Sequence, residues 1–290
     1  MFIGIDHGTT AIRFASEDKY FKISRKDAVY FELSDLEEIC SVDDIEGFSV
    51  CYSMGDGISE ITNIRDVKNR GVITREGAGE HIGGGTRVYD EIYKSGIPAI
   101  VIPGIHRNSP TDPRFKVYSH QTSPEKLGIA YEVMQKLGDD FIVSDVSSNT
   151  VSLLVSEGKI TGAFDACVFA PGRKHGAIDV DGIRKIDYGE WTANEAFMHA
   201  GVDENLPESD RLSALAMFSA MECASLGLLN KNAKIALAGS AAPLIASEVS
   251  GLLGVDVLVY DEWCASVGLF KIARDVFSGK SSILGLDVRL

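Results

Sequence analysis

The sequence contains no continuous apolar run of about 18 residues, the length at which a segment becomes a candidate membrane-spanning helix. Its first residues enter an apolar strand that ends in an aspartate, without the basic stretch and short apolar run of a secretory signal. We therefore expect no membrane partner and a cytoplasmic location.

The chain also has little cysteine. Its five cysteines lie far apart in the sequence and form no Cys-x-x-Cys pair, the spacing that is typical of zinc sites. Most of them lie in apolar segments, where a thiol acts as a small core residue. Neither a zinc site nor a disulfide framework is expected.

Basic residues are the minority among the charged side chains. The sequence has 28 Lys and Arg against 42 Asp and Glu, which gives a formal net charge of -14. Such an acidic chain repels the phosphate backbone of nucleic acids, so a nucleic-acid partner is not expected. The 290 residues, 45% of them hydrophobic, suffice for one large α/β domain or two smaller ones.

The most informative pattern lies at the start of the chain. An apolar strand from Phe2 to Asp6 leads into a turn that contains Gly8, Thr9 and Thr10, and a second strand follows. Gly8 has no side chain to keep a phosphate oxygen away from the backbone amides, and the threonines add hydroxyl donors. Asp6 at the strand end can hold magnesium through its water shell. An ordinary hairpin with a glycine turn is the alternative.

A similar order of elements returns in the second half of the chain. The strand from Phe141 to Asp145 again ends in an aspartate, and the polar turn of Ser147, Ser148 and Asn149 leads into a strand that starts at Thr150. Residues of this type favour tight turns between strands. The shared positions of an aspartate at the strand end and a threonine at the re-entry indicate an internal repeat. Two unrelated β-meanders are the alternative.

The C-terminal part alternates between helix and strand patterns. The expected elements are a helix from Glu208 to Leu229, a strand from Lys234 to Ala238, a helix from Ala241 to Leu253, a strand from Asp256 to Val259 and a helix from Glu262 to Phe277. This alternation predicts a parallel sheet with helices on its faces. Between the two copies of the repeat, residues 71–126 are rich in glycine and proline and are expected to be rich in loops.

These motifs, taken in order, resemble those of the acetate and sugar kinase, heat-shock chaperone and actin superfamily. The stretch from Gly4 to Thr10 is similar to the first phosphate motif of that superfamily, and Asp145 to Thr150 stands in the place of the second. The stretch from Leu237 to Pro243 stands in the place of the adenosine motif. The resemblance covers nearly the whole chain. Within the superfamily, the opening and the Asp-x-Ser-Ser-Asn-Thr turn are similar to methanogenesis marker protein 12, an archaeal family.

The resemblance implies a duplicated ribonuclease H-like (actin-like ATPase) α/β fold with two lobes, residues 1–126 and 127–290, and an interdomain cleft. It also implies ATP and Mg²⁺ as cofactors, with Asp6 and Asp145 as the metal-binding residues. Nucleotide-binding roles are implied for residues of three turns: Gly8, Thr9, Thr10, Ser147, Ser148, Asn149, Thr150, Gly239 and Ser240. The second turn has serines and an asparagine where superfamily members usually have glycines, so ATP binding there is expected to differ.

Two residues are candidates for the chemistry itself. Arg173 lies in a segment that resembles the Arg-Ser-Gly of acyl kinases, and its guanidinium can bind a phosphoryl group or a carboxylate through two parallel hydrogen bonds. Asp56, within Gly55-Asp56-Gly57, is the candidate base. The alternative for Arg173 is an ordinary surface arginine. The alternative for Asp56 is an aspartate that only stabilises a turn. Four basic residues lie close together in the sequence: His106, Arg107, Arg114 and His120. They either bind an anionic acceptor or belong to a solvated surface loop.

Three functions remain open. The first is an ATP-dependent phosphotransferase that acts on a small, anionic substrate such as a carboxylate. The second is an ATP-hydrolysing switch or assembly factor, linked to methanogenesis, that acts on a protein client. The third is a binding module that has kept the fold without nucleotide chemistry. The choice between a monomer and a homodimer is also open.

Overall fold

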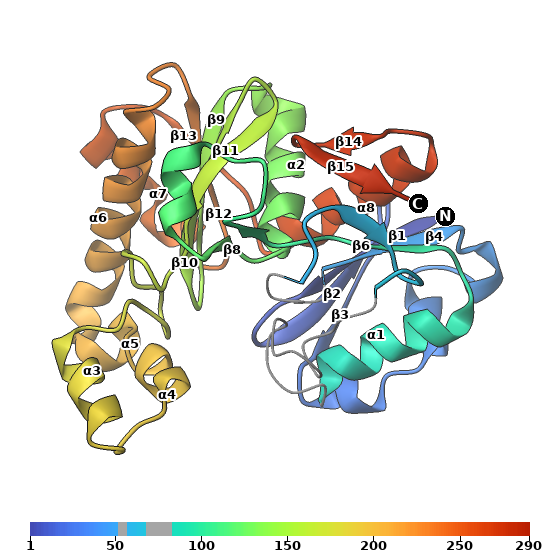
Figure 1. Ribbon diagram of the computed structural model, residues 1–290, viewed down its shortest axis with the longest axis horizontal. Coiled ribbons are helices and arrows are strands. Elements are labelled where there is room, and N and C mark those ends of the chain that lie inside the picture. Colours follow the sequence, from blue (N-terminus) through green and yellow to red (C-terminus); the bar gives the residue numbers. More distant parts are fainter. Residues whose placement is uncertain (52–56, 68–82) are drawn as a thin grey trace. The chain divides into compact units, whose positions relative to one another are not determined.

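The computed structural model describes residues 1–51, 57–67 and 83–290, and Figure 1 labels its helices and strands. The chain divides into two compact units. The first comprises Met1–Lys136 and Trp263–Leu290, and the second comprises Leu137–Glu262. This division differs from the lobes expected at residues 1–126 and 127–290, because residues 127–136 and the C-terminal segment pack with the N-terminal residues.

The described residues of the first unit form a sheet of eight strands in the order β14-β15-β5-β6-β4-β1-β2-β3. Strands β1 (Phe2–His7), β2 (Ala11–Ala15) and β3 (Tyr20–Ser24) form two antiparallel hairpins. Strand β4 (Gly47–Val50) runs parallel to β1, and β6 (Ala99–Val101) runs parallel to β4. The other strands are β5 (Ile61–Asn63), β14 (Ser282–Ile283) and β15 (Leu286–Arg289).

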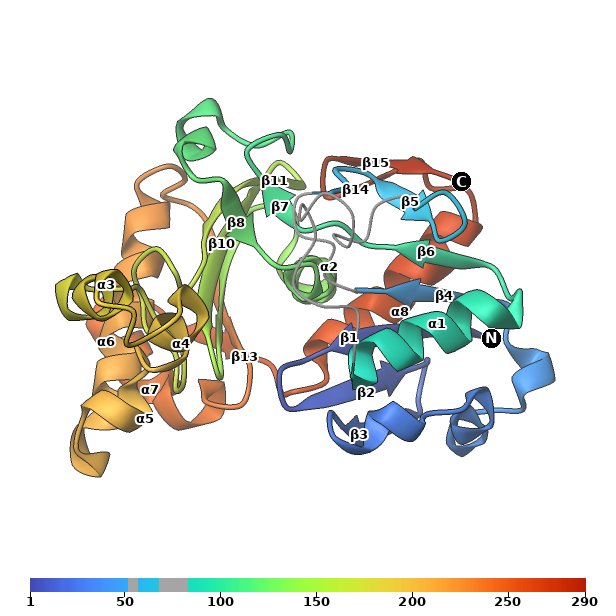
Figure 2. The ribbon, with the colours of Figure 1, turned by 60° about the horizontal axis from the view of Figure 1, so that its bottom comes forward.

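Two helices of the first unit cover opposite faces of this sheet (Figure 2). Helix α1 (Gly84–Ser95) shares a hydrophobic core with β1, to which Ile92 and Ile5 contribute. Gly4 of β1 faces α8 (Cys264–Phe277), because a Cβ atom added to Gly4 would lie 2.3 Å from the carbonyl oxygen of Ser266. Successive residues of a strand point to opposite faces, so the alternation of Gly4 with Ile5 places α1 and α8 on opposite sides.

The first unit also contains helix α2 and several shorter elements. Helix α2 (Glu125–Leu137) follows a small antiparallel hairpin of β7 (Ile105–His106) and β8 (His120–Thr122). Four short 3-10 helices complete the unit: Asp27–Tyr30, Leu33–Glu38, Val42–Asp44 and Pro113–Val117. The 3-10 helix Leu33–Glu38 begins with a capping box between Glu32 and Asp35.

The second unit contains a sheet of five strands in the order β11-β10-β9-β12-β13. Its strands are β9 (Phe141–Val146), β10 (Thr150–Ser156), β11 (Lys159–Phe164), β12 (Lys234–Ala238) and β13 (Val257–Val259). Its long helices are α6 (Glu208–Gly227) and α7 (Ala242–Leu253), which share a core with β9 and β12. Three short helices precede α6: α3 (Val180–Asp187), α4 (Ala193–Met198) and α5 (Val202–Asn205).

The predicted repeat is confirmed by the strand order. In the first unit β3-β2-β1-β4-β6 follow one another, and in the second unit β11-β10-β9-β12-β13 do so, with the same two antiparallel pairings and then two parallel ones. Asp6 and Asp145 are each the fifth residue of a six-residue first strand. The chain thus has the duplicated ribonuclease H-like architecture that was expected.

The two hairpin turns are not equal in length, which corrects one part of the predicted repeat. The last pair of the first hairpin is His7 with Ile12, whereas the last pair of the second is Val146 with Thr150. Thr150 therefore corresponds to Ile12 and not to Thr10, because the first turn contains one more residue.

Among the described residues, no helix is long and apolar enough to cross a membrane.

Candidate functional site

The first hairpin is anchored by an ion pair beneath its turn. Asp6 and Arg13 are cross-strand partners in β1 and β2, and Arg13 Nη1 lies 3.5 Å from Asp6 Oδ2. Both side chains are largely buried. A Cβ atom on Gly8 would lie 2.9 Å from the Ala11 carbonyl oxygen, so the turn needs glycine there. Thr9 and Thr10 are exposed, so the predicted phosphate donors lie at the surface of the turn.

The buried groups beside Asp6 stay neutral. The Cys51 thiol lies 3.8 Å from Asp6 Oδ1, and the His7 amide donates to Cys51 Sγ. Burial and the nearby Asp6 carboxylate raise the pKa of Cys51 well above its ordinary value, which excludes a thiolate nucleophile at neutral pH. Burial and the positive charge of Arg25 lower the pKa of His7 to about 3. His7 is thus an uncharged imidazole at neutral pH.

A buried ion pair at the start of α2 was not predicted from the sequence. Lys126 is only 5% exposed, and its Nζ donates to Glu125 Oε1 at 2.9 Å. Ser123 Oγ donates to the same oxygen at 2.5 Å. Burial by itself raises the pKa of Glu125, but the Lys126 charge and these hydrogen bonds outweigh it, and the pKa is lowered. Ser-Pro-Glu-Lys is an ordinary helix start in sequence, so only the burial reveals this pair.

The second hairpin turn is held by the segment that contains Arg173. The amides of Arg173 and Lys174 donate to the carbonyl oxygens of Ser147 and Ser148 at 2.9 and 3.0 Å. Thr150 Oγ1 donates to the Pro171 carbonyl oxygen at 2.8 Å. The backbones touch at Gly172, where an added Cβ atom would lie 2.4 Å from Asn149 Cα. Residues far apart in sequence, 147–150 and 171–174, therefore form one rigid layer.

Some polar groups of this turn are used in hydrogen bonds within the protein, and others are not. The Asn149 side chain is hydrogen-bonded to His175 Nδ1, and the Asn149 carbonyl oxygen accepts from the Ser147 amide. Within the ranges that the structure describes, the amides of Ser148 and Asn149 donate to no acceptor. Two adjacent amides of this kind in a turn form a concave anion-binding surface. The turn can therefore bind a phosphate oxygen with its backbone although it lacks glycine.

Arg173 itself is fastened to a carboxylate. Its Nε lies 3.2 Å from Asp203 Oδ2 on α5, and the Arg173 side chain is about half exposed, at 49%. The backbone contacts place it beside the second hairpin turn, as its predicted role requires. Its contact with a substrate remains a prediction. Such a contact requires the guanidinium either to bind Asp203 and the substrate together or to release Asp203.

The predicted adenosine turn packs directly on Asp145. Strand β12 runs parallel to β9, with Ala238 beside Asp145. Gly239 has a φ of 90°, and an added Cβ atom would lie 2.1 Å from Asp145 Oδ1. The Ala241 amide donates to the Val146 carbonyl oxygen at 2.9 Å. In the second unit, the structure therefore brings together Asp145, the turn at 147–149, Arg173 and the Gly239-Ser240 turn.

The carboxylate oxygens at the ends of the two hairpin strands suit Mg²⁺, which keeps several water ligands and binds few carboxylates. Each hairpin offers one aspartate, Asp6 or Asp145. Among the described residues there is no group of three or more His, Cys, Asp or Glu side chains that could hold a metal ion. These residues fit a magnesium ion that is bound chiefly by phosphate oxygens and water. The candidate base Asp56 lies outside the described residues.

Two members of the predicted basic group around His106 have partners within the fold. His106 is buried, with Nε2 bonded to the Ile58 carbonyl oxygen and Nδ1 accepting from the Asn108 amide. Arg114 forms two side-chain hydrogen bonds with Asp112, whose pKa they lower to about 2. His106 also pairs with His120 across the β7–β8 hairpin. The binding of an anion by this group remains a prediction.

Solved structures of kinases share this fold. A propionate kinase from Francisella tularensis matches with a TM-score of 0.63 and 11% identity, covering 94% of this chain and 99% of that one. A ROK family glucokinase from Streptomyces griseus, solved with glucose and AMPPNP, matches with a TM-score of 0.52 and 14% identity, covering 94% and 99%. At these identities the likeness establishes the kinase-type actin-like fold alone.

No family model matches the chain, but whole-length relatives exist in methanogens. A UPF0285 protein from Methanosarcina mazei is 45% identical, covering 99% of this chain and 98% of its own length. A UPF0285 protein from Methanocaldococcus jannaschii is 44% identical with the same coverage. With this identity over almost its full length, the chain belongs to the UPF0285 family.

Proposed function

We propose that the protein binds ATP with Mg²⁺ and transfers the γ-phosphoryl group to a small anionic substrate. The observation that carries this proposal is the duplicated hairpin with an aspartate at the same position, Asp6 and Asp145. A fold shared with solved acyl and sugar kinases supports it. A plain scaffold has no need for two buried carboxylates at equivalent strand ends, because burying a charge is costly.

Each turn has a separate part in this proposal. In the first unit Thr9 and Thr10 bind phosphate oxygens, and in the second unit the amides of Ser148 and Asn149 do so. Asp6 and Asp145 are the residues that would hold Mg²⁺ through its water shell, and the chemistry that Mg²⁺ would supply is the neutralisation of phosphate charge. The Gly239 turn lies along the nucleoside, where the absence of a side chain lets the backbone come close.

The transfer is a displacement at phosphorus. An acceptor oxygen forms a bond to the γ-phosphorus as the bond to the β,γ-bridging oxygen breaks, and ADP leaves with the electron pair. A carboxylate acceptor has no proton to lose, whereas a hydroxyl acceptor passes its proton to a base, for which Asp56 is the candidate. Arg173 supplies positive charge to the acceptor or to the moving phosphoryl group.

Calorimetry with ATP and Mg²⁺ tests the binding step. Asp6→Asn and Asp145→Asn are each expected to weaken Mg²⁺-dependent ATP binding by about tenfold or more. Asp181→Asn is the matched control, because Asp181 is exposed and pairs with Lys185 within α3. Wild-type protein that binds no ATP at millimolar concentration would contradict the proposal and favour the nucleotide-free binding module.

An ATP-hydrolysing switch or assembly factor linked to methanogenesis is the second candidate. Two observations favour it: the second turn has Ser147, Ser148 and Asn149 in place of glycines, and the relatives named above come from methanogens. A panel of small carboxylates and sugars separates the two functions. ADP release stimulated by a metabolite supports the kinase, whereas release stimulated only by a co-purifying protein supports the switch.

A further inference from the structure

The first turn of α2 lies at the edge of the sheet where the parallel strands of the first unit end. Strand β4 lies between β1 and β6, and all three run in the same direction. Asp6 is near the end of β1, Cys51 directly follows β4, and the chain after β6 leads through the β7–β8 hairpin to α2. Ligands of open α/β sheets bind at this edge.

Packing against α8 places the start of α2 near the end of β1. Helix α8 packs along β1, and Phe277 at its end stacks on Phe2 at the start of the strand, with ring centroids 5.6 Å apart. The start of α8 therefore lies toward the end of β1, which carries Asp6. A Cβ atom on Gly128 would lie 2.4 Å from the carbonyl oxygen of Ala265, so the first turns of α2 pack on this part of α8.

The burial of Lys126 is unusual for a lysine in the first turn of a helix. A lysine normally keeps its ammonium group in water, and a buried ammonium is costly unless it is paired. A helix N-terminus also disfavours a positive charge. Here the stem is covered, Glu125 pairs with the head group and Ser123 holds Glu125 in place. The result is a positive charge held in one position at the start of α2.

We propose that Lys126 contacts the terminal phosphate of bound ATP in the first unit, and that Glu125 and Ser123 position its ammonium group. An ammonium has three N–H donors and can hold Glu125 and a phosphate oxygen together. The inference rests on the proposed function, because it assigns a further residue to the same phosphate site. A purely structural ion pair at the start of a helix is the alternative.

The test compares ATP with ADP, because only ATP has the γ-phosphate. Lys126→Met keeps the length of the side chain and removes its charge. It is expected to weaken Mg²⁺-ATP binding by about tenfold and to leave ADP binding within about twofold of wild type. Lys126→Arg, which restores a positive charge, is expected to recover part of the preference for ATP.

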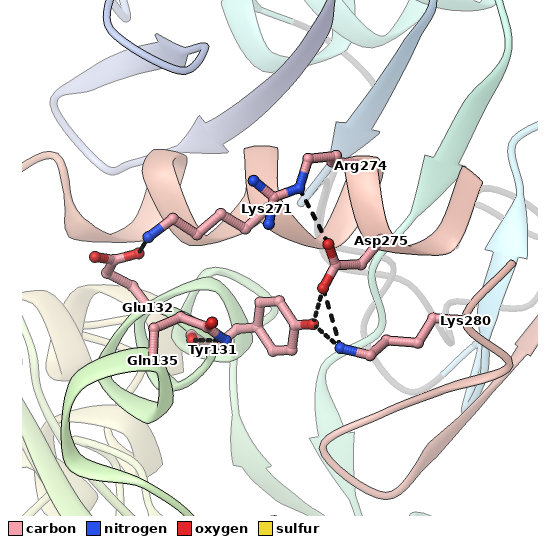
Figure 3. Close-up of polar contacts among 7 residues, drawn as sticks. All are labelled: Tyr131, Glu132, Gln135, Lys271, Arg274, Asp275 and Lys280. Atoms are coloured by element: carbon pink, nitrogen blue, oxygen red, sulfur yellow. Dashed lines mark hydrogen bonds and ion pairs between the residues drawn. The ribbon is translucent and has the colours of Figure 1, made fainter. Parts of the chain in front are cut away.

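Lys271→Met is the matched control. Lys271 also binds a glutamate of α2, with its Nζ 2.5 Å from Glu132 Oε2, and it lies in the same unit (Figure 3). The loss of this second ion pair between a lysine and an α2 glutamate is expected to change neither ATP nor ADP binding. A general effect of charge removal would appear in both variants, whereas a phosphate contact appears only in Lys126→Met.

The outcomes separate the inference from the proposed function. If wild type binds ATP and Lys126→Met binds it equally well, or loses ATP and ADP to the same degree, the inference is wrong and the proposed function stands. If wild type binds neither nucleotide, the proposed function fails and the inference falls with it. Should Lys126→Met not fold, Ser123→Ala decides, because it removes the hydrogen bond that holds Glu125 in place. It is expected to weaken Mg²⁺-ATP binding more than ADP binding, and an equal effect on both nucleotides overturns the inference.

Discussion

Gly128 of α2 and Gly268 of α8 are in backbone contact: a Cβ atom added to Gly268 would lie 1.8 Å from the carbonyl oxygen of Gly128. A Cβ atom on Gly128 would lie 2.4 Å from the Ala265 carbonyl oxygen. The two helices therefore cross with no room for a side chain between them. The chain leaves the first unit at the end of α2 and returns to it just before α8.

Polar contacts beside the glycines join the same two helices (Figure 3). Tyr131 Oη donates to Asp275 Oδ2 at 2.5 Å, and Lys280 Nζ donates to Tyr131 Oη at 2.7 Å and to Asp275 at 3.0 Å. Lys271, one turn before Asp275 in α8, binds Glu132, the residue after Tyr131. The glycine contact sets how closely the helices approach, and the polar groups hold them in one alignment.

Gly268→Ala is expected to destabilise the protein by about 2 to 3 kcal/mol, because its methyl group meets backbone atoms that cannot move aside. Gly251→Ala is the control, since Gly251 is in α7 and has open space where a Cβ would lie. That change is expected to stabilise by about 0.5 to 1 kcal/mol through helix propensity. Urea unfolding of both variants measures the difference, and a Gly268→Ala protein as stable as wild type would refute the backbone contact.

Tyr131→Phe removes the hydroxyl group between Asp275 and Lys280. The loss of a hydrogen bond to a charged group is expected to cost about 1.5 kcal/mol, seen as a lower urea midpoint. Tyr30→Phe, at a tyrosine that is 81% exposed, is expected to change the midpoint little. Equal midpoints for the two variants would show that the contacts of Tyr131 add no stability.

Glu222 of α6 is fully buried, and burial raises its pKa to about 8. Its Oε1 accepts from the Ala170 amide, and within the described residues its Oε2 has no partner. The pKa of Glu222 in the folded state lies above the ordinary 4.5. The stabilisation that protonated Glu222 contributes to the fold is therefore complete below about pH 4.5 and is lost as the pH rises through about 8.

Glu222→Gln keeps the shape of the side chain and cannot ionise. Relative to wild type it is expected to gain about 4 kcal/mol of stability between pH 5 and pH 8.5, since the wild-type glutamate must take up a proton on folding or bury its charge as the pH rises. Glu190→Gln, at an exposed glutamate, is the control and should show no such trend. Parallel pH profiles for wild type and Glu222→Gln would contradict the assignment of a neutral buried carboxyl.

Gly239→Ala tests the contact between the third turn and Asp145. Its added methyl group would collide with the Asp145 carboxylate and the Val146 carbonyl oxygen, so it is expected to weaken Mg²⁺-ATP binding by about tenfold or more. Gly254→Ala is the control, because Gly254 also has a positive φ but open space around it. It should cost about 1 kcal/mol and leave binding unchanged. Unaltered ATP binding by Gly239→Ala would count against Asp145 as a metal-binding residue.

The predicted strands and turns of the two hairpins agree with the structure because they are local. Alternating apolar residues specify β1, β2, β9 and β10, and Gly, Ser, Thr and Asn specify the turns between them. The return of the C-terminal residues to the first unit was not predictable in this way. Strand β15 pairs with β5, more than two hundred residues earlier in the chain, and no local pattern encodes such a partner.

Candidate site residues show the same limit. Asp6, Asp145 and the three turns were identifiable, because residue type and position along a strand carry their chemistry. Lys126 was missed, because its significance depends on its burial at the start of α2, which packs against α8. Arg173 was identified, but its attachment to the Ser147 carbonyl oxygen and to Asp203 depends on long-range contacts.

By itself, the sequence determined the internal duplication, the fold class and the positions of the two strand-end aspartates, because periodicity and turn chemistry act over a few residues. Only the tertiary structure decided that α2 and α8 cross at two glycines, that Gly239 packs on Asp145, and that Lys126 is buried at the start of α2. These relationships depend on close packing between distant segments, where the space for a single methyl group or the loss of water around one charge determines what each residue can do.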